Sequence, residues 1–174
     1  MRLRSPRQLT KGDDLEGFVC SSEEQTDWLH NHARQAHATG TAKVMVVTEV
    51  DSIAVVAYYA WSMSSVSTND ASQRLLKGAG KPIALLARLG VDRDYERQGL
   101  GAALLKDVIA RSAAISTEIG CRGLLVHAET RVARDFYLHL IPEFEPSPTD
   151  ELHLVVLMKD IRKTLNKGSF MPPD

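Results

Sequence analysis

An apolar strand, a turn with two glycines and an amphipathic helix follow one another between residues 82 and 118. The sequence predicts the strand over 82–91 (PIALLARLGV) and the helix from Gly99 to about residue 118. Gly99 and Gly101 let the backbone come close to a ligand, and the unpaired amides and positive dipole end of the helix favour an anion. The sequence therefore predicts a phosphate-binding turn inside a fold in which a strand leads directly into a helix.

Two well-known phosphate-binding motifs do not fit this chain. A dinucleotide fingerprint needs a further glycine at the position of Leu104. A P-loop at 78–81 (GAGK) would need glycine at Leu75 and a hydroxyl residue at Pro82. Dinucleotide and ATP binding are therefore poor interpretations of the glycines.

The rest of the chain predicts an alternation of helices and strands in the order α, β, β, β, α, β, α, β. A capping-box pattern in residues 21–24 (SSEE), with Glu24 three positions after Ser21, starts a helix that ends near Gly40. The remaining elements are expected at 42–50, 53–62, 123–127, 130–139 and 152–158, with a polar excursion at 63–81 that includes a short helix at 71–77. We expect an α/β (α+β) fold: one domain over residues 1–168 with a single mixed sheet flanked by helices, and a flexible tail at 169–174.

Two features of this pattern concern which side chains are buried. Leu104 and Val108 share an apolar stripe of the helix that starts at Gly99, whereas the charged Asp107 falls outside that stripe. Tyr58 and Tyr59 alternate along a strand, so one is expected to face the core and the other a surface or cleft.

Composition excludes several classes of protein. Lys and Arg total 21 against 22 Asp and Glu, so the net charge of −1 argues against a strongly basic nucleic-acid-coating protein. The two cysteines form no CxxC motif and the histidines have no ligand spacing, which predicts neither a disulfide framework nor a metal site. We find no signal-peptide or membrane-helix pattern and expect a cytoplasmic protein without a membrane partner.

Two segments, Glu96–Gly101 (ERQGLG) and Ala133–Tyr137 (ARDFY), resemble motifs of a known family, the Gcn5-related N-acetyltransferases (GNAT). Glu96–Gly101 (ERQGLG) resembles the family's pyrophosphate loop (Q/R)xxGx(G/A), except that Glu96 takes the first position and Arg97 comes one step late. Ala133–Tyr137 (ARDFY) resembles the AxxFY stretch that ends in the tyrosine near the coenzyme A sulfur, with Thr130 where the family often has asparagine. The resemblance implies the GNAT fold with a central β-loop-α coenzyme A site, acetyl-CoA as the co-substrate and no metal.

The resemblance also implies roles for particular residues. Tyr137 would donate a proton to the leaving thiolate, whereas outside the family context it would be a core tyrosine with a satisfied hydroxyl. A dedicated base is dispensable, because a free α-amino group with a pKa of about 7.7 to 8.0 is partly neutral at cytoplasmic pH. The expected acetyl-CoA contacts are Leu89, Gly90, Val91, Arg97, Gln98, Gly99, Leu100, Gly101, Ala102 and Phe136.

The resemblance extends to the acetyltransferase toxins of bacterial toxin-antitoxin pairs. The segments that carry it are 15–20 (LEGFVC) with Trp28 and Leu29, 56–60 (VAYYA) and 86–92 (LARLGVD). It implies transfer of acetyl to the α-amine of aminoacyl-tRNA, inhibition of translation, neutralisation by a ribbon-helix-helix antitoxin, contact with DNA only through the antitoxin complex, and a homodimer.

Three alternatives stay open from the sequence. Arg88 lies within an apolar strand, where it forms either a structural ion pair or a contact with the acceptor end of the tRNA. The cations between residues 74 and 97 form either a solvated mixed surface or a phosphate-binding patch. The chain itself could instead acetylate a small amine or a protein N-terminus, or act as a catalytically weak partner in antitoxin-dependent autoregulation.

Overall fold

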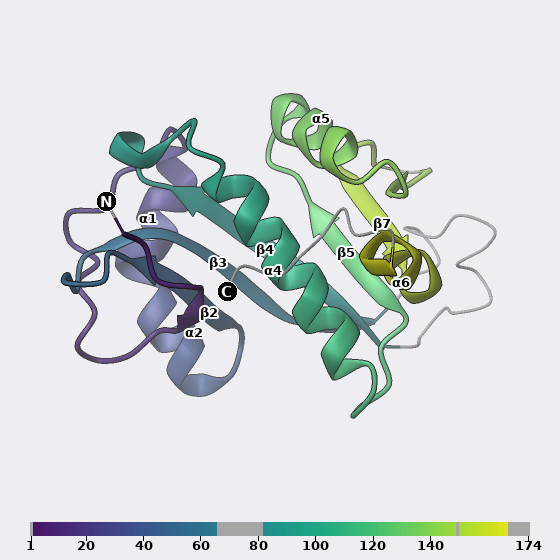
Figure 1. The fold of residues 1–174 in the computed structure, drawn as a ribbon, viewed down its shortest axis with the longest axis horizontal. Coiled ribbons are helices and arrows are strands. Elements are labelled where there is room, and N and C mark those ends of the chain that lie inside the picture. The colour runs from purple at the N-terminus through teal and green to yellow at the C-terminus, as the bar shows by residue number, and fades with distance from the viewer. Residues whose placement is uncertain (1, 66–81, 149, 167–174) are drawn as a thin grey trace. The chain divides into compact units, whose positions relative to one another are not determined.

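The computed structural model describes residues 2–65, 82–148 and 150–166, which form two compact units (Figure 1). Of the described residues, one unit contains 2–62 and 87–107, and the other contains 63–65, 82–86, 108–148 and 150–166. The single domain over 1–168 stays a prediction. The helix expected at 71–77 and the tail expected at 169–174 lie outside the described residues.

The strands form one mixed sheet, in which neighbours hydrogen-bond in the order β1-β2-β3-β4-β5-β7-β6. Their bounds are β1 Arg7–Gln8, β2 Lys43–Thr48, β3 Val55–Ser65, β4 Pro82–Val91, β5 Gly123–His127, β6 Glu145–Pro146 and β7 His153–Leu157. β4 and β5 are parallel, whereas the pairs β1–β2, β2–β3, β5–β7 and β6–β7 are antiparallel. The predicted mixed, mostly antiparallel sheet is confirmed.

The described helices are α1 Glu23–Asn31, α2 Ala33–Thr39, the 3-10 turn η1 Arg93–Tyr95, α4 Leu100–Ile115, α5 Arg131–Leu140 and α6 Met158–Asn166. The predicted helix start in the SSEE segment is confirmed, but the cap is Ser22, one residue after the serine with an acid three positions on; its hydroxyl accepts from the Gln25 amide at 3.1 Å. The single helix expected up to Gly40 is two helices joined at His32, and Gly40 ends the second one in the left-handed conformation. The sequence prediction missed α6, and it missed β1 and β6, which at two residues each are too short to show a pattern.

The core of the first unit lies on both faces of β2 and β3. Tyr58 packs in a cluster with Leu29 and Ala33, on the face that α1 and α2 cover in Figure 1. Tyr59 points to the opposite face, where its hydroxyl donates to Asp107 of α4 at 2.6 Å. Both tyrosines are fully buried, so the expectation that one would face a surface or cleft is wrong, because helices cover the sheet on both sides. Asp107 is also buried, although it was expected outside the apolar stripe.

The second unit is organised around β5 and β7. Five register pairs join these strands, and Gly123 lies so close to β7 that an added Cβ would be 2.1 Å from the Val156 carbonyl oxygen. Helix α5 follows the carboxyl end of β5. Helix α6 begins directly after β7, and the Met158 amide donates to the carbonyl of Arg122 at 2.8 Å, just before β5.

Candidate functional site

The predicted phosphate-binding turn has a left-handed backbone at two positions. Gly99 has φ 83°, and Arg97 has φ 62°, the one positive φ on a non-glycine residue among those described. An L-residue rarely adopts this conformation, and residues that do so cluster at functional loops. Apart from its two chain neighbours, no described residue has an atom within 4 Å of the position that a Cβ on Gly99 would take, so the backbone there is accessible to a ligand.

The amino end of α4 follows this turn at once. The first backbone bond of the helix runs from the Ala103 amide to the Gly99 carbonyl at 3.0 Å. The amides of Leu100, Gly101 and Ala102 therefore have no partner within the helix and carry the positive end of its dipole. Since Arg97, Gln98 and Gly99 are exposed beside them, the turn fits the pyrophosphate of coenzyme A in charge and in accessibility.

Leu89, Gly90 and Val91 form the last part of β4. The parallel ladder with β5 pairs only Ala84 to Leu86, and β4 then continues to Val91. At Gly90 an added Cβ would lie 3.1 Å from Tyr58 Cε1, so glycine is required for close packing against the first unit's core. Contact of these three residues with acetyl-CoA stays a prediction.

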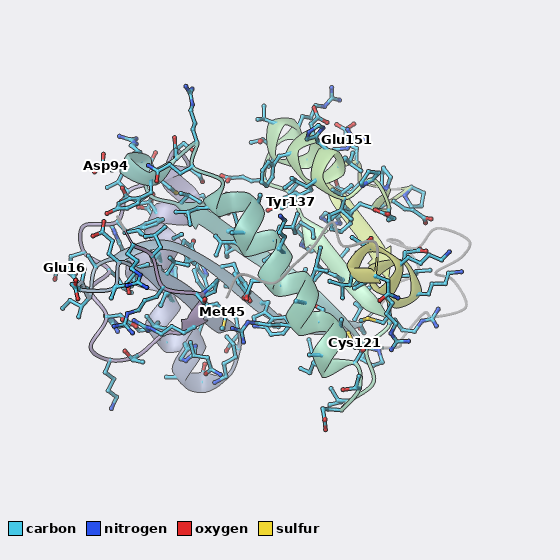
Figure 2. The ribbon with its side chains drawn as sticks, viewed as in Figure 1. Glu16, Met45, Asp94, Cys121, Tyr137 and Glu151 are labelled. Atoms are coloured by element: carbon cyan, nitrogen blue, oxygen red, sulfur yellow. The ribbon has the colours of Figure 1, made fainter. Side chains whose placement is uncertain are left out.

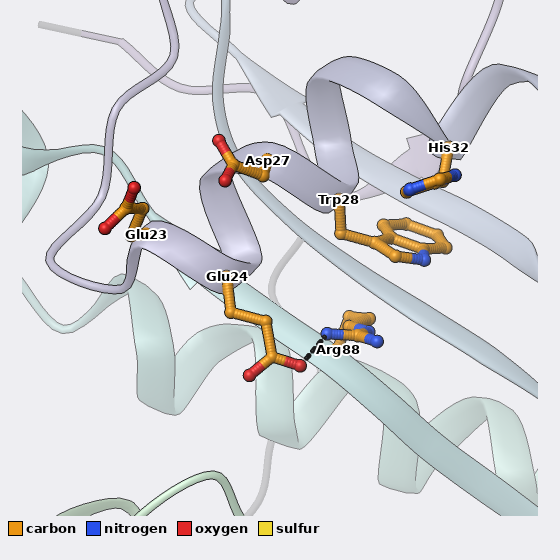
Figure 3. Close-up of a pocket in the computed structure, with 6 residues that line it drawn as sticks. All are labelled: Glu23, Glu24, Asp27, Trp28, His32 and Arg88. Atoms are coloured by element: carbon orange, nitrogen blue, oxygen red, sulfur yellow. Dashed lines mark hydrogen bonds and ion pairs between the residues drawn. The ribbon is translucent and has the colours of Figure 1, made fainter.

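Arg88 forms the structural ion pair that was one of its two alternatives. Its Nη1 lies 2.8 Å from Glu24 Oε1, and its guanidinium carbon lies 5.6 Å from the centre of the Trp28 ring (Figure 3). The side chain is 26% exposed, so the charge is held at a half-buried position by a carboxylate and an aromatic face. The ring of Trp28 in turn lies parallel to that of Tyr58 at 6.1 Å.

A hollow opens beside Arg88, lined by Glu23, Glu24, Asp27, Trp28, His32 and Arg88 (Figure 3). Three carboxylates and one guanidinium give its wall a negative balance. Such a surface attracts a cation and repels a phosphate backbone. The sequence prediction missed the partnership of Glu24 with Arg88, because 64 residues separate the two and no local spacing connects them.

Tyr137 lies on α5 with its ring buried and 6% of the residue exposed (Figure 2). The rings of Phe136 and Phe144 meet it edge-on at 5.5 and 6.5 Å. No described residue hydrogen-bonds its hydroxyl. The alternative role of Tyr137, a core tyrosine whose hydroxyl is hydrogen-bonded within the protein, is therefore not supported by the described residues. Burial, and then the negative charge of Glu129, raise the pKa of Tyr137, so the phenol keeps its proton at neutral pH.

The start of α5 explains one departure from the family pattern. The Thr130 hydroxyl accepts a hydrogen bond from the Ala133 amide at 3.1 Å and caps the helix. Threonine therefore performs the capping that asparagine would also perform. One helical turn further on, Phe136 is 37% exposed, which leaves part of its ring accessible to a ligand.

Metal ligands, cysteines and long apolar helices could define other kinds of site in residues 2–65, 82–148 and 150–166. Within them, no group of three or more His, Cys, Asp or Glu residues is placed to hold a metal ion. Cys20 is buried, Cys121 is half-buried, and both are free thiols. None of the described helices is both long and apolar enough to span a membrane.

Sequence comparison places this chain among the acetyltransferases: the profile of the acetyltransferase (GNAT) family matches residues 20–140, and the chain belongs to that family. A "tRNA-acetylating toxin" of Mycobacterium tuberculosis (strain ATCC 25618 / H37Rv) is 39% identical over 160 residues, which cover 91% of this chain and 94% of the toxin. A "Probable toxin TacT" of Sinorhizobium fredii (strain NBRC 101917 / NGR234) is 27% identical over 87% of this chain and 89% of its own length.

A solved structure gives the same result for the fold. AtaT complexed with acetyl-methionyl-tRNAfMet matches with a TM-score of 0.83 and 25% identity, covering 94% of this chain and 99% of AtaT. The GNAT fold and the resemblance to acetyltransferase toxins are thereby confirmed.

Proposed function

We propose that this protein transfers the acetyl group of acetyl-CoA to the α-amine of aminoacyl-tRNA and thereby inhibits translation. The observation that carries the proposal is the 39% identity, over 91% of the chain, to a protein named as a tRNA-acetylating toxin. AtaT, whose structure with acetyl-methionyl-tRNAfMet matches along almost the whole chain, supports the same substrate.

Acetyl-CoA supplies the thioester that is attacked. The amides of Leu100, Gly101 and Ala102 and the exposed Arg97 and Gln98 would bind its pyrophosphate around Gly99, because unpaired helix amides favour an anion. The backbone of Leu89 to Val91 would hold the pantetheine arm, and the accessible part of the Phe136 ring would cover it.

In the transfer, the substrate nitrogen forms a bond to the thioester carbonyl carbon and the carbon–sulfur bond breaks. The departing thiolate takes a proton from the Tyr137 hydroxyl, and the proton that the nitrogen loses passes through solvent to the Tyr137 oxygen and restores the phenol. Because burial raises the pKa of Tyr137, its hydroxyl carries a proton at neutral pH before the reaction begins. An α-amine with a pKa of about 7.7 to 8.0 is partly neutral before it binds, so the reaction does not depend on a strong protein base.

Arg88 is proposed to contact the acceptor end of the tRNA. In the structure its guanidinium forms an ion pair with Glu24, so the RNA has to compete with that carboxylate. The variant Glu24→Gln frees the guanidinium and should strengthen this contact.

The proposed partners are also inferred from the similarity to AtaT. AtaT has been solved as a mutant bound to the C-terminus of the antitoxin AtaR and acetyl-CoA, with a TM-score of 0.80 and 25% identity, covering 95% of this chain and 99% of AtaT. We propose that a ribbon-helix-helix antitoxin neutralises this protein, that DNA is contacted only through their complex, and that the active form is a homodimer. A toxin that consumes charged tRNA acts where translation occurs, which places it in the cytoplasm.

A second candidate is acetylation of a small amine. The hollow lined by Glu23, Glu24 and Asp27 favours it, because this negative surface attracts an ammonium group and repels RNA phosphates.

The deciding experiment measures transfer of labelled acetyl from acetyl-CoA to a pool of aminoacylated tRNAs. Uncharged tRNA, a panel of small amines and the Tyr137→Phe variant are the controls. Label on charged tRNA alone, lost in the variant, is the expected result. Label on small amines alone would establish the second candidate, and no label on either, with acetyl-CoA binding intact, would indicate a catalytically weak partner protein.

A further inference from the structure

Helix α6 presents three positive charges on one face. Lys159, Arg162 and Lys163 are exposed and follow one another at i, i+3 and i+4, so their side chains project from the same side of the helix. Met158, Ile161 and Thr164 occupy the opposite, buried side. The charges therefore face solvent as a group.

Folding of α6 does not require this arrangement. Like charges at i and i+4, as at Lys159 and Lys163, destabilise a helix. Lys159 also lies in the first turn, where the positive end of the helix dipole disfavours a cation. Among the described residues none of the three forms an ion pair, and Arg162 makes only a 3.4 Å hydrogen bond to the Ser116 hydroxyl.

A fourth cation, Arg122, contacts the first residue of α6 through its backbone. The carbonyl of Arg122 accepts a hydrogen bond from the amide of Met158, the first residue of α6, at 2.8 Å. The Arg122 side chain is half-buried, and its Nε has no hydrogen-bond partner among the described residues. We call Lys159, Arg162 and Lys163 the α6 basic face.

Most other described arginines of the chain are committed to internal partners. Arg4 donates to the Val50 carbonyl, Arg7 pairs with Asp13 at 2.7 Å, and Arg34 donates to the carbonyls of Thr10 and Asp13. Arg88 pairs with Glu24 beside two further carboxylates. The α6 basic face is therefore a concentration of positive charge that the fold leaves available to a polyanion.

We propose that the α6 basic face binds the sugar-phosphate backbone of the tRNA whose aminoacyl end is acetylated. The inference rests on the proposed function and adds a second contact region for the same substrate. The positive charge of the face is complementary to the negative phosphates of the RNA, and Lys and Arg clusters bind such phosphates independently of the nucleotide sequence.

The placement within the second unit fits such a contact. Helix α5, with Tyr137, follows the carboxyl end of β5, whereas α6 adjoins its amino end through Arg122. A five-residue strand spans roughly 17 Å. The basic face can thus hold a double-stranded part of the RNA while the single-stranded end extends toward α5.

The test compares the full-length protein with the triple variant Lys159→Gln, Arg162→Gln, Lys163→Gln. Acetyl transfer to charged tRNA is measured as a function of salt, beside transfer to a small-amine probe, an amino-acid amide. For the triple variant we expect KM for charged tRNA to rise on the order of tenfold, with a dependence of log KM on log salt that is shallower by about 2 to 3. Transfer to the amide and the affinity for acetyl-CoA should not change.

A matched control removes the same charge elsewhere. Arg2→Gln, Lys11→Gln, Lys43→Gln alters three exposed cations of the first unit and should leave the salt dependence as in the wild type. If the triple variant folds poorly, Lys159→Gln with Lys163→Gln removes only side chains with no described contact.

The outcomes are distinct. If wild-type protein acetylates charged tRNA but the α6 variants keep its KM and salt dependence, the inference is wrong and the proposed function stands. If wild-type protein acetylates no charged tRNA, the proposed function has failed and this inference fails with it. A shallower salt dependence in the α6 variants alone establishes the contact.

Discussion

The hydroxyl of Tyr59 on β3 donates a 2.6 Å hydrogen bond to Asp107 Oδ2 on α4, and both side chains are buried. The bond joins the sheet to the helix about two turns beyond Gly99. It therefore fixes the end of α4 whose free amides form the candidate pyrophosphate turn. A buried carboxylate here is a positioning group for the turn and has no expected contact with substrate.

Replacing Tyr59 by phenylalanine should lower stability and weaken acetyl-CoA binding. The ring still fits, but a buried carboxylate loses a donor, which costs about 1 to 3 kcal/mol. Urea denaturation and calorimetric titration with acetyl-CoA measure the two effects. Asp107→Asn keeps an acceptor for the hydroxyl and should bind acetyl-CoA more tightly than Tyr59→Phe; equal loss in both variants would contradict a positioning role.

Tyr137→Phe should bind acetyl-CoA as the wild type does and lose most acetyl transfer. Removal of a positioned proton donor typically lowers the rate by a factor of about 10² to 10⁴. Single-turnover transfer at saturating acetyl-CoA separates this loss from binding. Because no described residue hydrogen-bonds the hydroxyl, the variant should keep the thermal stability of the wild type, and unchanged transfer would refute the assigned role.

Substitutions at the two left-handed positions of the turn should have opposite effects on stability. Gly99→Ala places an L-residue at φ 83° and should destabilise by about 1 kcal/mol while weakening acetyl-CoA binding. Arg97→Gly relieves strain at φ 62° and should stabilise the fold, yet it removes a positive charge from the turn. In that variant we expect a higher free energy of unfolding together with a weaker affinity for acetyl-CoA. Unchanged affinity would show that Arg97 does not contact the coenzyme.

The hydrogen-bonded carboxylate of Asp13 should make the protein less stable in acid. Burial raises the pKa of Asp13, but hydrogen bonds from Arg7 at 2.7 and 2.9 Å and from Thr10 outweigh burial and hold it below its usual value. A lowered folded-state pKa contributes stability above the unfolded value of about 3.9, and this contribution disappears as the pH falls through the folded value. The difference in unfolding free energy between wild type and Asp13→Asn should be large at pH 7 and shrink below about pH 4. Chemical denaturation at several pH values measures it, and a constant difference would be the contrary result.

Gly123→Ala should disrupt the second unit. The added Cβ would lie 2.1 Å from the Val156 carbonyl oxygen, which is backbone and cannot turn away. The β5–β7 ladder has to shift. We therefore expect the free energy of unfolding to fall by about 1 to 3 kcal/mol or more, as in other overpacked cores. Gly120→Ala, whose Cβ would make an ordinary 3.5 Å contact with Pro82, is the matched control and should change the melting temperature little.

Much of the fold could be predicted because its signals are local. Strand β4 and the start of α4 fall where the apolar run and the glycine turn placed them, and α1 begins in the SSEE segment that the capping-box pattern indicated. The turn's candidate residues were found for the same reason, since a strand, two glycines and a helix are adjacent in the chain. Helix α6 was missed because Met158 continues the apolar run of β7 and no turn residue separates the two elements.

By itself, the sequence determined the order of the main elements, the backbone turn proposed to bind phosphate and the family, all of which depend on residues a few positions apart. Tertiary structure decided the pairing of Arg88 with Glu24 across 64 residues and of Tyr59 with Asp107 across 48. It also decided that Tyr58 and Tyr59 are both buried. Alternation along a strand fixes only that neighbours point to opposite faces; whether each face is covered depends on helices that pack there from distant parts of the chain.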